Sequence, residues 1–308
     1  MSSTAGRQSP FPDVLAIFGP TASGKTAVAA AIAERIPAEL VSADSMQVYR
    51  GLPILTNQDA GARLVGIWPL DRQGTVGEFQ ALAHKAIDEI VAAGRTAVVV
   101  GGSGLWFQAA LTDMSLPADV PADARARWER LYDRRGPAVA HGILQSRDAR
   151  AAAQVHPNDR KRVVRALELW QAGGTLVPER PRLWTASVRR PTLVVGLDVS
   201  RELLATRIRA RTEAMFEQGV EEEVRAAGDV VPQVLGLDAV LRLPRVEAIA
   251  ELDRGTQRFA AYQRKWMRRI PGIVMIDADR PVGEVADAIL EREARFLPGP
   301  PLTSRDER

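Results

Sequence analysis

The sequence predicts an α/β fold, a parallel sheet covered by helices, with an inserted all-helical domain. Apolar, β-prone runs alternate with helix-forming segments in the first and last thirds of the chain, whereas strand-like runs vanish from the middle. Alternation of this kind is typical of a parallel sheet with helices on both faces. The chain has 308 residues, 46% of them hydrophobic, which is enough to bury such a sheet.

The first part of the sheet is predicted from three apolar runs with helical segments between them. We expect strands at Val14–Phe18, Glu39–Ala43 and Thr96–Val100, and helices at Lys25–Arg35 and Val76–Ala93. The second helix carries its large apolar residues along one face, which indicates that it packs on the sheet.

The composition of the chain changes between Met114 and Arg190, where helix-forming segments rich in Ala, Arg and Asp are separated by prolines. After it, a strand is expected at Thr192–Asp198 and a long helix from Arg201 to Ala227. A last strand is expected at Ile273–Asp277 and a closing helix at Val282–Arg295. The predicted division is a disordered leader (1–12), an α/β core (13–113 and 191–298), a helical insertion (114–190) and a loose tail (299–308).

The first predicted strand runs directly into a phosphate-binding loop of the P-loop NTPase type. Gly19 and Gly24 let the backbone curl until successive N–H groups point at one anion, Lys25 adds a positive charge, and the Thr26 hydroxyl can hold Mg²⁺. The helix that follows directs its positive end at the same place. The expected diphosphate- or nucleotide-binding residues are Gly19, Pro20, Thr21, Ala22, Ser23, Gly24, Lys25 and Thr26.

Two further loops are expected at the same edge of the sheet. Asp44 and Ser45 follow the second strand, and Gly101–Gly104 follows the third. Ligands of parallel α/β sheets bind beyond the carboxyl ends of the strands. Taken alone, Asp44 would be better explained as a turn or helix-capping residue than as a catalytic one.

Composition excludes several kinds of chemistry. The chain has no cysteine, so disulfides, thiolate metal sites and cysteine nucleophiles are ruled out. Its three histidines, His84, His141 and His156, are scattered. No apolar run approaches the length of a membrane span and the N-terminus lacks a signal-peptide core, so we expect a soluble, cytoplasmic protein without a membrane partner.

The net charge is only +3, but the basic residues are clustered. Such clusters suit a phosphate-rich partner. Exposed arginine-rich helices with no partner account for them equally well, given the Ala/Arg/Val bias of the chain. The clusters lie at Arg160–Arg162, Arg189–Arg190, Arg207–Arg211 and Arg264–Arg269.

An ordered set of motifs resembles the tRNA dimethylallyltransferase family, also called tRNA isopentenyl transferases. Gly-Pro-Thr-Ala-Ser-Gly-Lys-Thr stands unbroken at Gly19–Thr26, and Ser-Ala-Asp-Ser-x-Gln-Val-Tyr-Arg at Ser42–Arg50. The remaining matches, in chain order, are Val99–Leu105, His156–Asp159, Arg165–Glu168, Arg207 with Arg211, Met215 and Gly219, and Gln263 with Trp266.

The resemblance implies transfer of a dimethylallyl group from dimethylallyl diphosphate to N6 of the adenosine beside the tRNA anticodon. In this family's pattern Asp44 is the general base, Thr21 hydrogen-bonds the diphosphate, and Arg211 stabilises the leaving group together with Lys25. Magnesium on Thr26 is the implied cofactor.

The same resemblance implies a tRNA anticodon stem-loop as partner and a flipped adenine in the pocket. We expect a monomer. The residues expected to contact tRNA are Asp44, Ser45, Met46, Gln47, Ser103, Lys161, Arg162 and Arg165.

The chain departs from the family pattern at residues 53–58, 66–71 and 236–239, and at Ser103, where threonine is customary. These departures affect adenine and RNA recognition more than phosphate chemistry. Three alternatives therefore stay open: an enzyme that prenylates free adenine nucleotides, a small-molecule P-loop kinase, and a non-catalytic RNA-binding protein.

Overall fold

The computed structural model describes residues 12–114, 122–176, 187–228, 230 and 233–293. These residues form two compact units, the first within Met1–Asp113 and Ala186–Arg308, the second within Met114–Thr185. We call them the sheet unit and the helical unit. The expected leader and tail lie outside the described residues, except for Pro12.

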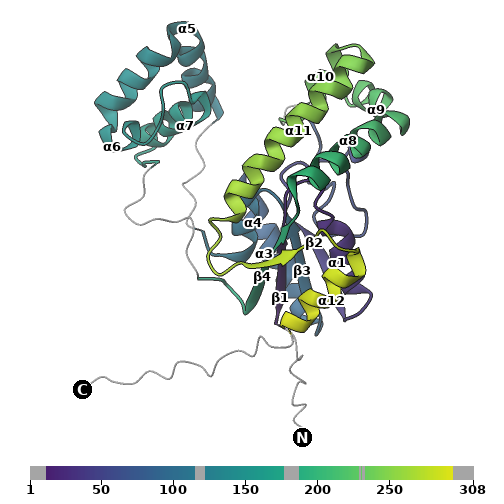
Figure 1. The fold of residues 1–308 in the computed structure, drawn as a ribbon. Helices are drawn as coiled ribbons and strands as arrows, with labels where there is room; N and C mark the ends of the chain where they lie inside the picture. The colour runs from purple at the N-terminus through teal and green to yellow at the C-terminus, as the bar shows by residue number, and fades with distance from the viewer. Residues whose placement is uncertain (1–11, 115–121, 177–186, 229, 231–232, 294–308) are drawn as a thin grey trace, which may run out of the picture. The chain divides into compact units, whose positions relative to one another are not determined.

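The sheet unit is built on five parallel strands in the order β2-β3-β1-β4-β5 (Figure 1). The central strands β1 and β3 are buried along their whole length, as expected for a parallel sheet covered on both faces. The strands are β1 (Val14–Phe18), β2 (Ala38–Ser42), β3 (Thr96–Gly101), β4 (Thr192–Asp198) and β5 (Val274–Asp277).

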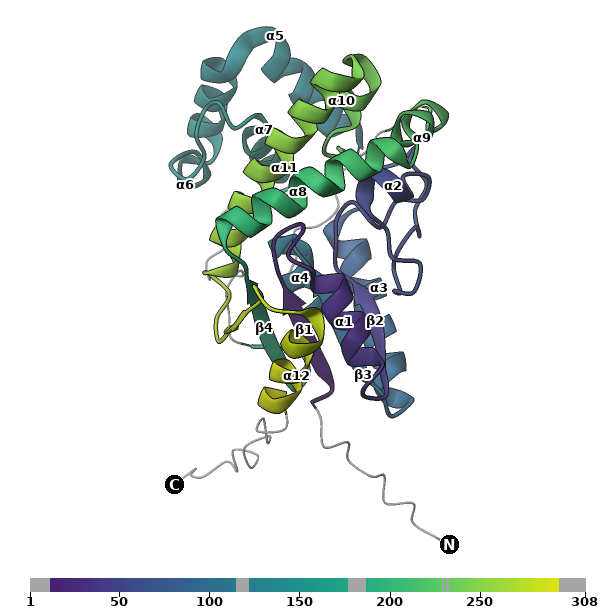
Figure 2. The same cartoon turned by 45° about the vertical axis from the view of Figure 1, so that its right-hand side comes forward.

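Alternate residues of β1 pack on opposite sides of the sheet. Leu15 and Ile17 join the core beneath α1 (Lys25–Ala33) and α12 (Val282–Glu293), which lie together on one face (Figure 2). Phe18 instead contacts Phe107 of α4, with ring centroids 5.1 Å apart in an edge-to-face arrangement. The other face is covered by α3 (Val76–Ala92) and α4 (Gly104–Leu111).

The helix expected from Arg201 to Ala227 is in fact two helices, α8 (Arg201–Glu217) and α9 (Val220–Ala226). Gly219 separates them with a φ of 91°, a left-handed conformation that continues no helix. Short helices also form at α2 (Pro53–Thr56) and α10 (Leu237–Arg242), and a long one at α11 (Arg245–Met267). Figures 1 and 2 show α8 and α11 side by side beyond one end of the sheet.

The helical unit consists of α5 (Ala122–Arg147), α6 (Ala149–Ala152) and α7 (Arg160–Gln171) around its own apolar core. Gly136, with a φ of 81°, bends α5 just before Pro137. The Asp159 carboxylate caps α7 by accepting from the N–H of Arg162 at 3.1 Å.

The last residues of the expected insertion, 186–190, belong to the sheet unit. Asp88 of α3 forms ion pairs of 2.6 Å with both Arg189 and Arg190, and these arginines hold the pKa of Asp88 down at about 2. This basic pair therefore fastens the chain to α3. Among the described residues, no helix combines the length and apolar character needed to cross a bilayer.

Candidate active site

Three loops meet where β1, β2 and β3 end. The N–H of Gly19 donates to the Gly101 carbonyl at 3.2 Å, and the N–H of Ala43 donates to Val100 at 2.7 Å. A Cβ at Gly101 would lie only 2.7 Å from the Ala43 carbonyl oxygen, so glycine is needed for this approach. The phosphate loop, the Asp44 loop and the Gly101–Gly104 loop are thus adjacent.

The phosphate loop has the curled backbone that its glycines predict. Gly24 caps α1 with a φ of 86°, and Ala22 also takes a left-handed φ of 62°. The Ser23 hydroxyl is buried and has no hydrogen-bond partner among the described residues. An unsatisfied donor in the loop that leads into a helix N-terminus suits an anionic ligand.

Lys25 lies within this loop, with its ammonium 3.4 Å from the Pro20 carbonyl oxygen. Desolvation lowers the pKa of Lys25 to about 8, although the nearby Asp44 carboxylate opposes the shift. The lysine as a whole is half-buried, and its ammonium is desolvated. Lys25 is therefore a cation with too little countercharge, which favours a bound anion.

Arg211 of α8 is the second cation at this place. Burial lowers the pKa of Arg211, and its charge acts on Lys25 and Asp44. The Nε atom of Arg211 is buried without a hydrogen-bond partner in the described part of the chain. Like the Ser23 hydroxyl, it is a donor that a phosphate oxygen would satisfy.

Asp44 is half-buried immediately after β2 and is oriented by its own loop. Its Oδ1 accepts the N–H of Met46 at 2.9 Å, in the turn geometry that a lone aspartate favours. The electrostatic coupling of Asp44 to Lys25 and Arg211 places one carboxylate beside two cations. The arrangement can hold a diphosphate and present a base at its edge.

The other expected contact residues divide into two groups. Gln47 is engaged within the protein: its Oε1 accepts from the Ser42 hydroxyl at 2.9 Å and its Nε2 donates to Asn57 at 2.7 Å. Ser45 and Met46 are partly exposed beside Asp44. Ser103 precedes α4 but makes no side-chain cap.

Two side chains that the sequence named only as matches to the family pattern, without a role, reach the phosphate loop from the C-terminal half. The Gln263 Oε1 of α11 accepts the N–H of Thr21 at 2.7 Å, and Arg207 of α8 donates to the Ser23 carbonyl at 3.5 Å. The available signal was a glutamine on the buried face of a helix, where an apolar residue is ordinary.

Lys161, Arg162 and Arg165 lie on α7 in the helical unit. Arg165 donates to the carboxylate of buried Glu168 at 3.0 Å. Val163 and Leu167 on the inner side of α7 are buried, whereas Trp170 is partly exposed and lies against the Arg147 guanidinium.

No cluster of three or more histidine or acidic side chains that could hold a metal ion occurs within the described residues. The loop instead offers Thr26, partly exposed in the first turn of α1. A single hydroxyl is a suitable Mg²⁺ ligand only when phosphate oxygens supply further positions.

Comparison with known proteins places this geometry in context. The model of the family described as IPP transferase matches residues 47–270. The tRNA dimethylallyltransferase of Salinispora arenicola is 39% identical, covering 90% of this chain and 85% of that protein. The tRNA dimethylallyltransferase of Streptomyces coelicolor is 36% identical, covering 96% of this chain and 98% of that protein. A crystal structure of the Bacillus halodurans tRNA isopentenylpyrophosphate transferase has a TM-score of 0.64 at 30% identity, covering 92% and 97%.

Proposed function

Because this chain belongs to the IPP transferase family, we propose that it transfers a dimethylallyl group from dimethylallyl diphosphate to N6 of the adenosine beside a tRNA anticodon. The observation that carries the proposal is the grouping of Lys25, Arg211 and Asp44 around the phosphate loop. Two desolvated cations suit the leaving diphosphate, and one carboxylate suits the attacking amine.

The donor half of the reaction needs negative charge to be stabilised as the allylic C–O bond breaks. The electron pair of that bond leaves with the diphosphate, which the loop amides, Lys25 and Arg211 are placed to hold. Thr21 stands in the same loop, and its hydroxyl is our candidate for a hydrogen bond near the bridging oxygen. Preorganised donors in a desolvated site stabilise such charge far more than water does.

The acceptor half forms the C–N bond from the N6 lone pair. Asp44 would orient the amine and take the N6 proton on its carboxylate, while the Met46 N–H holds that carboxylate in place. An adenine stacked in an anticodon loop cannot reach this position, so it must flip out. Ser45, Met46 and Ser103 are the neighbouring candidates for contact with the base or its ribose, and Gln47 for holding the loop in shape.

We assign Mg²⁺ to the diphosphate and the Thr26 hydroxyl. When bound, the ion would neutralise part of the charge that develops on the leaving group. Lys25 and Arg211 remain the protein's own contribution to that charge balance.

For the stem-loop we propose the exposed side of α7, with Lys161, Arg162 and Arg165 contacting phosphates or a splayed base. The arginine side chain is suited to both contacts, because its planar guanidinium can stack on a base and its N–H groups can donate two hydrogen bonds to one phosphate. The alternatives, a free-nucleotide prenyltransferase and a P-loop kinase, are not favoured, since the relatives above are named for tRNA.

The test is incubation of the full chain with labelled dimethylallyl diphosphate and either an undermodified anticodon stem-loop or AMP. We expect label in the stem-loop and little in AMP. Uptake into AMP alone would favour the free-nucleotide enzyme, and ATP consumption without prenyl transfer would favour a kinase.

Asp44→Asn or Asp44→Ala tests the base. Either change should lower prenyl transfer by a factor on the order of 10² or more while stem-loop binding stays nearly unchanged. Asp59→Asn is the matched control, because Asp59 makes the same type of turn contact, to the N–H of Gly61 at 3.0 Å, on the exposed surface. Full activity of the Asp44 variants would remove this residue from the chemistry.

A further inference from the structure

Ala22 occupies an unfavourable backbone conformation in the middle of the phosphate loop. Its φ of 62° lies in the left-handed region, which glycine enters freely and alanine does not. A strained residue persists only where its surroundings determine its conformation. The residues on either side of Ala22 therefore need contacts that hold them.

Both neighbours of Ala22 are held by side chains from the other half of the chain. Before it, the N–H of Thr21 donates to Gln263 Oε1 at 2.7 Å; after it, the Ser23 carbonyl accepts from Arg207 Nη1 at 3.5 Å. The bond to Gln263 is much the shorter, and Gln263 is only 2% exposed, so water cannot easily replace it.

Gln263 also contacts the neighbouring loop. A Cβ on Gly102 would lie 2.4 Å from Gln263 Nε2 and 2.8 Å from the Gly19 carbonyl oxygen. Three residues further along α11, the Trp266 ring lies so close to Gly104 that a Cβ there would be 1.9 Å from it. The end of α11 is therefore wedged between the phosphate loop and the Gly101–Gly104 loop.

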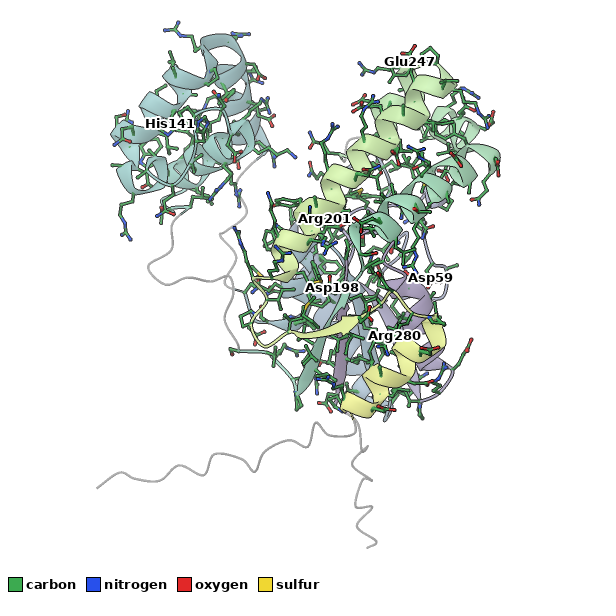
Figure 3. All side chains as sticks on the ribbon, in the orientation of Figure 1. Asp59, His141, Asp198, Arg201, Glu247 and Arg280 are labelled. Atoms are coloured by element: carbon green, nitrogen blue, oxygen red, sulfur yellow. The ribbon has the colours of Figure 1, made fainter. Side chains whose placement is uncertain are left out.

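The position of α11 is itself fixed at the sheet. Arg264 donates to the Val199 carbonyl at 2.8 Å and to the Asp198 carboxylate at 3.2 Å. Figure 3 labels Asp198 at the end of β4 and Glu247 near the opposite end of α11. Gln263 is thus presented by a long helix anchored beside the site.

We propose that Gln263 is a positioning residue that holds the phosphate loop in its anion-binding shape by accepting the N–H of Thr21 and so keeping Ala22 left-handed. The inference rests on the proposed function only in taking diphosphate as the ligand of this loop. A consequence is that the Thr21 N–H serves the loop, which leaves the Thr21 hydroxyl to face the diphosphate.

The test is calorimetric titration of the full chain with inorganic pyrophosphate. Gln263→Met keeps the length of the side chain but replaces the amide oxygen with a thioether, which is only a weak acceptor. It should weaken pyrophosphate binding about fivefold. Gln257→Met is the matched control: Gln257 is an exposed glutamine of the same helix, bonded to Asp253 at 2.8 Å, and its variant should bind like the parent.

Adding Ala22→Gly distinguishes a glutamine that holds the loop from one that only packs, because recovery of pyrophosphate affinity is expected only in the first case. Glycine adopts the left-handed conformation without strain, so the double variant Ala22→Gly/Gln263→Met should regain most of the lost affinity. Gln263→Asn, one methylene shorter, repeats the test should the methionine variant not fold.

Either of two results overturns the proposal: parental affinity in both Gln263 variants, or no recovery on adding Ala22→Gly. Absence of pyrophosphate binding by the parent protein would count instead against the proposed function. The two failures are therefore distinguishable.

Discussion

Removing the charge of Lys25 should stabilise the folded protein while it destroys the anion site. Desolvation lowers the pKa of this lysine from 10.5 to about 8. At about 1.4 kcal/mol per pH unit, keeping the ammonium charged in the ligand-free fold costs about 3 kcal/mol at neutral pH. Lys25→Met fills similar space without a charge, so its free energy of unfolding at pH 7 should exceed that of the parent by about that amount.

The pH dependence separates this electrostatic effect from packing. The folded protein releases the Lys25 proton near pH 8, whereas the unfolded chain keeps it to about pH 10.5. Between these values the unfolded state binds more protons, so the stability of the parent rises with pH. The advantage of Lys25→Met should therefore shrink from about 3 kcal/mol at pH 7 to about 1 kcal/mol at pH 9.5.

The assay is urea unfolding of both proteins at the two pH values, with pyrophosphate titration as the functional readout. Packing differences cancel, because they are the same at both pH values. The reasoning is refuted if the stability difference does not change with pH, or if the methionine variant still binds pyrophosphate as tightly as the parent does.

Two further predictions concern packing. Gly104→Ala should lower the free energy of unfolding, measured in urea, by about 2–3 kcal/mol, since a Cβ there meets the Trp266 ring. The control is Gly142→Ala, in open space on α5, which should raise the free energy of unfolding by about 0.5–1 kcal/mol. Equal effects of the two changes would contradict the packing argument. Glu168→Ala should cost the helical unit about 2–3 kcal/mol, because Arg125 and Arg165 lose a buried acceptor. Hydrogen exchange of the α7 amides measures this loss of stability. The control is Glu129→Ala, at a half-buried position, which should cost under about 1 kcal/mol. Equal exchange in the Glu168 and Glu129 variants would refute the prediction.

The sequence-based prediction succeeded where local pattern determines structure. The runs at β1 and β4 are apolar and flanked by Gly or Pro, so their expected bounds agree with the observed strands. No helix was predicted at α4, because every residue from Trp106 to Leu111 is buried. A helix buried on all sides has no amphipathic period to detect.

The break at Gly219 was missed for a different reason. The apolar pattern continues through it, and a single glycine within a helical pattern costs only about 1 kcal/mol. Gly219 takes a left-handed φ, and the helix beyond it, α9, is held by a distant segment: the Glu223 carboxylate accepts the N–H groups of Ile54 and Leu55 at 2.7 and 2.8 Å. A contact between residues so far apart leaves no local signal.

The same distinction applies to the site. Adjacent residues build the phosphate loop, so its shape follows from glycine positions alone. Arg211 and Gln263 reach that loop from the opposite half of the chain. Arg211 stood out as part of a basic cluster, but its role at the loop was indicated only by family resemblance. Nothing about a glutamine on a buried helix face identifies the N–H group from which it accepts a hydrogen bond.

Asp44 explains how two desolvated cations can coexist before any ligand arrives. Its carboxylate raises the pKa of both Lys25 and Arg211, which partly offsets their burial. It cannot neutralise both, so the ligand-free site keeps an excess of positive charge that a diphosphate would balance. Once an anion is bound, the two cations no longer depend on Asp44 alone for countercharge. In the reaction proposed here, this excess of positive charge favours binding of the diphosphate donor before transfer.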